Sequence, residues 1–149
     1  MVKHKAKRKG LVKIWFTLAC EEGYPPVSTE SLWASDAGDG LWRIDNIPFF
    51  TDAATLGDVV SVRKEDGQLW FQEWDEESDN SLLWVIIMSG SSQAVIAELM
   101  QAGCEVEKCD ENFFAVNVPP TVKLKSVQSI LRKREKRGEL EYSEPILRQ

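Results

Sequence analysis

The sequence predicts an α+β fold in which a small N-terminal antiparallel β-barrel-like unit packs on a C-terminal ferredoxin-like βαββαβ unit. The first half contains short β-prone runs separated by Gly-rich turns, whereas the second half repeats the order strand, helix, strand. A length of 149 residues suits one domain or two very small ones. We therefore expect four segments: a basic disordered tail at 1–10, a small antiparallel β unit at 11–74, an acidic linker at 75–80 and the ferredoxin-like unit at 81–145.

The predicted tail has five Lys or Arg residues, no acidic residue and no apolar pattern, which is typical of disorder. It contains His4, the only histidine of the chain. We therefore expect no Ser–His or Cys–His pair within the folded part, which excludes the common catalytic triads.

Short strands are predicted throughout 11–74. Five short strands joined by Gly-rich turns are typical of a small, strongly bent antiparallel barrel. Gly38-Asp39-Gly40 makes a hairpin turn, across which Trp33 and Trp42 are predicted to face each other. The predicted strands cover 11–19, 31–35, 41–45, 58–63 and 69–74.

Two consecutive β-α-β patterns make up the second half, which indicates a ferredoxin-like arrangement. Gly103 is well placed to end the first helix. The predicted strands cover 82–88, 104–108, 113–118 and 139–142, and the helices run to about 102 and from about 122 to 136.

Residues 82–88 are apolar at every position, so both faces of this strand are predicted to be buried. The two helices of a ferredoxin-like sheet cover only one face. The other face must then be covered by the N-terminal β unit or by a second copy of the chain, and we favour the N-terminal unit.

The net charge of −6 is unevenly distributed. Residues 11–121 hold twenty acidic and five basic residues, whereas residues 122–149 hold eight basic and four acidic ones. Such an acidic body repels nucleic acid and attracts basic partners. The simpler interpretation is that the acidic residues keep the fold soluble.

The three cysteines form an odd, small set, which suits a reducing cytoplasm. Cys104 and Cys109 have no histidine companion, so we predict small core residues rather than a zinc site. No apolar run approaches the roughly 20 residues of a membrane helix. We therefore expect a cytoplasmic protein without membrane contact, metal or cofactor.

Three segments carry a resemblance: PPVSTESLWA at 25–34, NIPFF at 46–50 and GDVV at 57–60. With them the chain resembles a bacterial family of uncharacterised domains marked by similar segments, from about Leu11 to about Pro145. The resemblance implies a small bacterial cytoplasmic protein and no known activity.

The chain has no P-loop and no GxGxxG pattern, and we assign no catalytic residue. Glu30 and Asp58 are candidate partner-binding residues, and the carboxylates to watch as an acid–base pair, because they lie within the segments of the resemblance. Local backbone bonding is nevertheless the favoured role for both. Four tryptophans are candidate partner anchors if they are exposed: Trp33, Trp42, Trp70 and Trp74. Seven basic residues are candidate phosphate contacts: Lys5, Lys7, Arg8, Lys9, Arg132, Lys133 and Arg134.

The acidic body, the aromatic-rich half and the missing catalytic histidine favour a non-enzymatic protein that binds another macromolecule. An inhibitor or immunity-type protein for a basic partner is one concrete form, as a monomer or a homodimer. A small-molecule-sensing regulatory module is one alternative. Weak nucleic-acid binding through the basic ends is another alternative. However, the predicted strand at 112–118 lacks the Lys/Arg-Gly-aromatic signature that RNA-recognition domains carry on their third strand. An enzyme that uses carboxylates alone ranks last.

Overall fold

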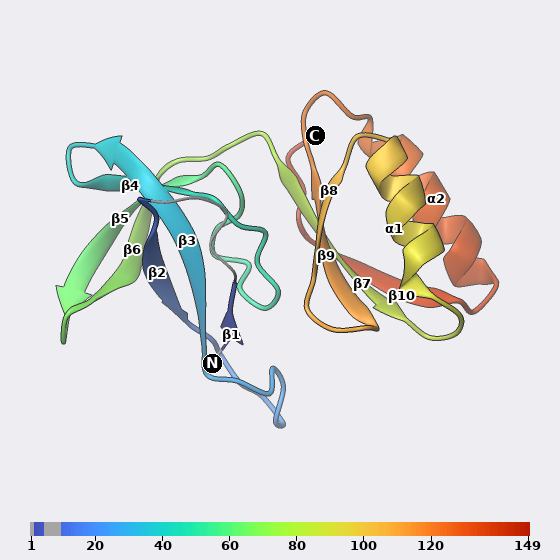
Figure 1. The fold of residues 1–149 in the computed structure, drawn as a ribbon, viewed down its shortest axis with the longest axis horizontal. Helices are drawn as coiled ribbons and strands as arrows, with labels where there is room; N and C mark the ends of the chain where they lie inside the picture. The colour runs from blue at the N-terminus through green and yellow to red at the C-terminus, as the bar shows by residue number, and fades with distance from the viewer. Residues whose placement is uncertain (1, 5–9) are drawn as a thin grey trace. The chain divides into compact units, whose positions relative to one another are not determined.

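The computed structural model describes residues 2–4 and 10–149 (Figure 1). Within these residues the chain has two helices and two mainly antiparallel sheets, so the predicted α+β class is confirmed. The chain divides into two compact units, Met1–Ser78 and Asp79–Gln149. The division falls inside the predicted linker at 75–80, the first part of which continues a strand.

The strands of the first unit pair in the order β1-β3-β2-β6-β5-β4, and β3 also pairs with β4. Each of the strands β2, β3, β4, β5 and β6 therefore pairs with the next one in this series, and β6 pairs with β2 again. The β2–β6 and β1–β3 pairs are parallel, and the others are antiparallel. The bounds are β1 (Val2–Lys3), β2 (Val12–Thr17), β3 (Thr29–Gly38), β4 (Leu41–Ile44), β5 (Val59–Glu65) and β6 (Gln68–Glu76).

Alternation along the strands forms the core of this unit. Ile14 and Leu32 lie opposite each other on β2 and β3, and both are fully buried in one apolar cluster. Trp42 pairs with Asp36 across the β3–β4 hairpin, and its side chain packs against the same cluster. Trp33 follows Leu32 directly in β3, so its side chain lies on the opposite face of that strand, where it pairs with Lys13 of β2. The predicted Trp33–Trp42 pair is therefore wrong, because the register of the hairpin sets the two rings on opposite faces.

Residues 2–4 are ordered rather than disordered. Val2 and Lys3 pair with Glu30 and Ser31 of β3, and His4 is buried. The predicted tail is therefore wrong at residues 2–4, because β1 satisfies backbone groups of β3 that β4 does not reach. The remainder of that prediction, at 5–9, lies outside the described residues.

The second unit is a four-stranded antiparallel sheet in the order β10-β7-β9-β8. Both helices lie on the same face of this sheet (Figure 1). The bounds are β7 (Ser81–Ile87), α1 (Ser92–Gln101), β8 (Glu105–Lys108), β9 (Phe113–Val118), α2 (Leu124–Lys136) and β10 (Leu140–Ile146).

The end of α1 confirms the predicted role of Gly103. Its φ is +106°, which L side chains rarely adopt, and its N–H donates to the Met100 carbonyl at 3.0 Å. A Cβ at this position would lie 2.7 Å from Cγ2 of Val122. The turn therefore requires glycine for its conformation and for its close packing.

The two faces of β7 differ in burial. Leu83 and Val85 are fully buried in the cluster that also contains helix residues such as Leu131. On the opposite face Leu82 is fully buried, but Ile86 is 44% exposed. The prediction that every position of 82–88 is buried is therefore wrong at Ile86 and at Met88, which follows the strand. Covering of this face by the N-terminal unit stays a prediction.

Removal of side-chain volume from the two faces of β7 should have unequal effects. We expect Leu83→Ala to lower the free energy of unfolding of the second unit by about 3 kcal/mol, because it leaves a cavity in the core. The matched Ile86→Ala should lower it by less than about 1 kcal/mol, because Ile86 is partly exposed. Urea denaturation followed by circular dichroism measures both, and equal losses would contradict the assignment of the faces.

Candidate functional site

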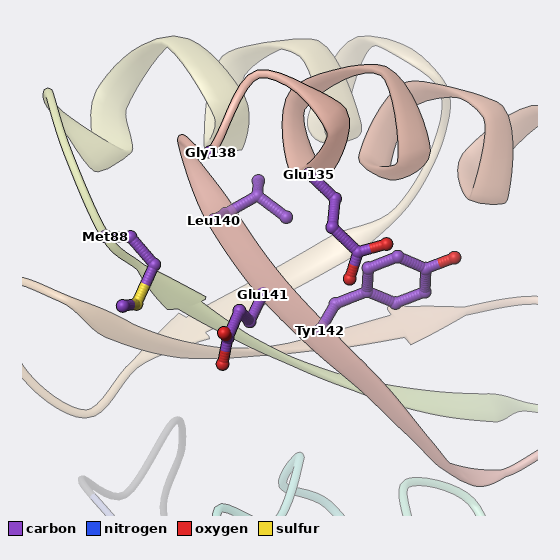
Figure 2. A pocket seen from close by; sticks show the side chains of 6 residues that line it. All are labelled: Met88, Glu135, Gly138, Leu140, Glu141 and Tyr142. Carbon is purple, nitrogen blue, oxygen red and sulfur yellow. The ribbon is translucent and has the colours of Figure 1, made fainter.

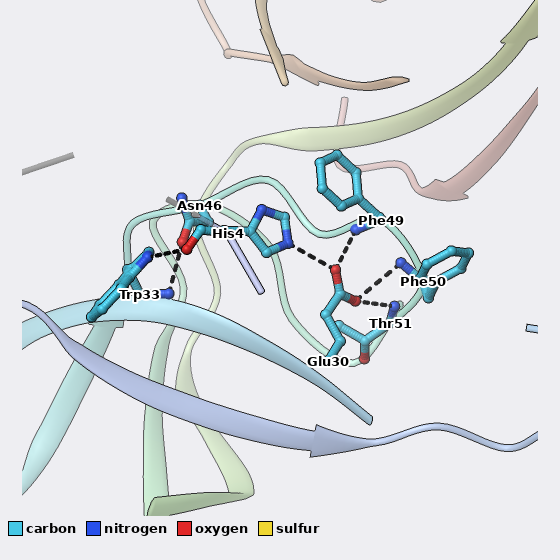
Figure 3. A network of polar contacts seen from close by, with 7 residues as sticks. All are labelled: His4, Glu30, Trp33, Asn46, Phe49, Phe50 and Thr51. Atoms are coloured by element: carbon cyan, nitrogen blue, oxygen red, sulfur yellow. Dashed lines mark hydrogen bonds and ion pairs between the residues drawn. The ribbon is translucent and has the colours of Figure 1, made fainter. Parts of the chain in front are cut away.

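A buried carboxylate near the start of β3 gathers the densest group of polar contacts in the first unit (Figure 3). Glu30 is fully buried and accepts three consecutive backbone N–H groups. Phe49 donates to Oε2 at 2.6 Å, and Phe50 and Thr51 donate to Oε1 at 3.0 and 2.8 Å. Charge-assisted bonds of this kind are about twice as strong as neutral ones. The carboxylate thus holds the loop after β4 against β3.

His4 supplies a fourth contact to the same carboxylate. Its Nε2 lies 2.9 Å from Oε2 of Glu30, and both side chains are almost fully buried. The imidazole stacks on the Phe49 ring at 4.3 Å between centroids, with 16° between the planes. The Trp33 indole N–H donates to the His4 carbonyl, so the backbone and the side chain of His4 are both held.

Two further polar residues of the loop complete the network. The Trp33 backbone N–H donates to Oδ1 of Asn46 at 2.7 Å. Asp58 is fully buried and accepts the backbone N–H groups of Thr55 at 2.9 Å and Ser78 at 2.8 Å. Glu30 and Asp58 therefore both bind backbone donors, but only the Thr55–Asp58 bond is local, because the donors to Glu30 lie 19 to 21 residues away.

The chemistry open to this network is limited by burial. A general base must reach a proton of its substrate, but Glu30 and His4 are enclosed and already hydrogen-bonded. We therefore assign Glu30, Asp58 and His4 to structure rather than to catalysis. His4 was missed because no feature of the sequence marks it: its partner lies 26 residues away and is reached only through the β1–β3 pairing.

The four candidate tryptophans do not form one surface. Trp42 packs against the core and Trp33 is half-buried, with Nζ of Lys13 at 5.1 Å from its ring centroid. Trp70 is also half-buried and lies under the guanidinium of Arg63, whose Cζ is 5.8 Å from its centroid. Trp74 alone of the four is exposed.

The candidate phosphate contacts divide into two groups. Arg132 and Lys133 are exposed on α2, whereas Arg134 is half-buried and forms ion pairs of 3.2 Å with both Glu98 and Glu139. Arg134 therefore links the two helices to the start of β10. Four candidates lie outside the described residues: Lys5, Lys7, Arg8 and Lys9.

The cysteines differ in environment. Cys104 is buried, and burial raises the pKa of its thiol to about 11. Cys20 and Cys109 are exposed, so the predicted core position is confirmed for Cys104 and wrong for Cys109, which follows the end of edge strand β8. Among the described residues, no group of three His, Cys, Asp or Glu side chains is arranged to hold a metal ion.

The fold and the buried network define a two-unit α+β protein. The chain matches the family described as "Domain of unknown function (DUF4265)" over residues 30–142, so it belongs to that family. The predicted membership of an uncharacterised domain family is thereby confirmed. The particular sequence segments that we expect to mark the family stay a prediction.

One solved structure is similar over most of the chain. It is the crystal structure of a hypothetical protein from Neisseria gonorrhoeae, with 25% identity and a TM-score of 0.79. The match covers 93% of this chain and 97% of that one, so it includes parts of both units. A search among curated proteins gave no match. Within the described residues, neither helix has the length and apolarity to cross a membrane.

Loss of the Glu30 charge should destabilise the first unit. We expect Glu30→Gln to lower the free energy of unfolding by about 3 kcal/mol, because the amide replaces one acceptor oxygen with a donor that faces buried N–H groups. Denaturation followed by tryptophan fluorescence measures this loss. Glu73→Gln, at an exposed position of β6, should change stability by less than about 0.5 kcal/mol. Equal effects of the two substitutions would contradict the structural role of Glu30.

Thiol labelling should separate the cysteines. Because the pKa of Cys104 is raised to about 11, its reactive thiolate is scarce at pH 8, and burial also blocks access. We expect Ellman's reagent to label Cys20 and Cys109 rapidly in the native protein, and Cys104 only after denaturation. Rapid labelling of all three thiols in the native state would contradict the burial of Cys104.

Proposed function

We propose that this protein is not an enzyme and binds a basic protein partner through the outer end of β6. The observation that carries this proposal is the exposure of Trp74 within an acidic stretch. Its side chain is 51% exposed, although its ring edge still contacts Phe71 at 6.2 Å between centroids. The neighbouring acidic residues are exposed as well: Glu73, Asp75, Glu76 and Glu77.

The physical argument rests on complementarity. A cluster of carboxylates attracts a basic partner and speeds the encounter, while contributing less to the final affinity. An exposed indole ring can then pack against the partner and accept a Lys or Arg side chain over its face. Tryptophan is enriched among residues that dominate binding energy at interfaces. The Phe71 contact limits the freedom of the Trp74 ring before binding, which lowers the entropic cost of association.

The finer description of the protein belongs to the same proposal. We infer a barrel-like first unit, since its strand pairing returns to β2, and a ferredoxin-like second unit, since β10-β7-β9-β8 is the expected order of two β-α-β units. A cytoplasmic inhibitor or immunity-type protein of a bacterium is the form of this function that the acidic surface favours.

Exposed basic residues on α2 support a second candidate, weak binding of nucleic acid. Arg132, Lys133 and Lys136 are exposed there, whereas Arg134 and Arg137 are engaged in ion pairs. Contacts of this kind give affinity that falls steeply with salt.

A pull-down from native lysate near physiological salt, with and without nuclease, tests the proposal. We expect a basic protein to be recovered in both arms, and Trp74→Ala to weaken its binding roughly 30-fold, as for an interface hot spot. Tyr24→Ala is the matched control, because Tyr24 is 60% exposed but lies outside the acidic stretch. Equal binding by wild type and Trp74→Ala would overturn the proposed surface. Loss of every partner on nuclease treatment would favour the basic face of α2.

A further inference from the structure

Strand β6 is paired along its whole length on one side and only near its start on the other. On the first side, β5 pairs with β6 from Gln68 to Glu76. On the second side, β2 meets β6 only at Leu69 and Trp70, and no further pairing of β6 is found among the described residues. The backbone of 72–76 therefore has a free edge, whose outward N–H and C=O groups no described strand binds.

This edge is open to a partner, because every residue of 72–76 is exposed. The pairing with β5 passes over Gln72 and Asp75, so two β-bulges lie in this part of the strand. Bulges bend a strand and redirect its side chains, and they are common at sheet edges and beside binding sites. A strand rises about 3.3 Å per residue, so the edge has room for a partner segment of roughly five residues.

The side chains along the edge determine which charge the partner carries. Four carboxylates lie here without an ion pair among the described residues: Glu73, Asp75, Glu76 and Glu77. The β5 residues that pair with this part of β6 are uncharged: Val59, Val60 and Ser61. The free edge is therefore anionic over its whole length.

The basic residues nearest in the strand register do not neutralise this edge. Arg63 and Lys64 of β5 pair with the first half of β6, and the guanidinium of Arg43 on β4 donates to the Gly57 carbonyl at 3.1 Å. Like charges on neighbouring strands are destabilising, whereas cross-strand pairs of opposite charge are stabilising. The carboxylates therefore disfavour pairing with an acidic strand and favour pairing with a basic one.

The hollow at the end of α2, in the second unit, does not gather charged groups in this way. Its volume is about 390 Å³, and it lies where α2 ends and β10 begins. Figure 2 shows Glu135 and Tyr142 on one side of β10 and Met88 and Glu141 on the other. These lining side chains therefore do not converge on one ligand.

We propose that the free edge of β6 at 72–76 binds an extended basic segment of the partner as an added β-strand. This inference rests on the proposed function, and it states which part of a basic protein the Trp74 surface takes. Backbone hydrogen bonds along the edge supply affinity, and alternate Lys or Arg side chains of the partner meet the carboxylates. Trp74 lies at the middle of the edge, where its indole ring packs against one of these side chains.

An NMR titration of the full chain with the peptide acetyl-Arg-Val-Arg-Val-Arg-Val-amide tests the proposal. Two analogues carry backbone N-methyl groups, one on its Arg residues and the other on its Val residues, so each loses the donors of one edge and keeps the charge. A strand that adds to β6 uses only one of its edges. We expect saturable shifts of the amides of 71–76 with the parent peptide. One analogue should bind roughly tenfold more weakly, because two or three hydrogen bonds are lost, and the other within about twofold of the parent.

Variants of the protein locate the binding surface. Trp74→Ala should weaken binding of the parent peptide roughly tenfold, and Asp75→Asn should weaken it roughly threefold. Glu111→Gln, which removes an exposed carboxylate of the second unit, should leave binding unchanged.

The outcomes separate this inference from the proposed function. Binding that depends on Trp74 but is equal for the parent and both methylated analogues, or is lost equally with both analogues, would overturn strand addition and leave the proposed function standing. Absence of saturable shifts at 71–76 with the parent peptide would also overturn strand addition, while the pull-down decides the proposed function independently. Equal binding of the parent peptide by wild type and Trp74→Ala would overturn the Trp74 surface and this inference together.

Discussion

The first unit depends on the burial of one carboxylate. A charge that leaves water without compensation is strongly destabilising, so Glu30 can occupy its position only while donors surround it. Three consecutive backbone N–H groups and the His4 imidazole provide them. The same contacts hold the loop after β4 and residue His4 against β3. A single side chain thereby joins parts of the unit that are distant in sequence.

This constraint explains why three segments, 25–34, 46–50 and 57–60, come together in the first unit. Glu30 comes from the first segment, its backbone donors begin in the second, and Asp58 of the third binds the far end of the same loop. Each segment alone has an ordinary composition. They share one physical task, which is to satisfy the backbone polar groups of a long buried loop that no sheet can pair.

The partner surface that we propose therefore lies outside the buried network. The buried network has no access for a substrate, whereas the end of β6 presents an indole ring among carboxylates. The second unit has its own core and its own ion pairs around Arg134. The carboxylates around Trp74 belong to residues 11–121, which hold twenty acidic and five basic residues.

The sequence by itself determined the order of strands and helices and the α+β class, because periodicity, turn residues and capping are local properties. The tertiary structure alone decided which side chains meet. In the tertiary structure Trp42 packs against the core and Trp74 is exposed. The strand-pairing registers and β-bulges decide this difference, and the alternation of apolar and polar residues in the sequence does not specify them. The tertiary structure also brought His4 to Glu30, because a charge buried by distant parts of the chain selects its partner only after the chain has folded.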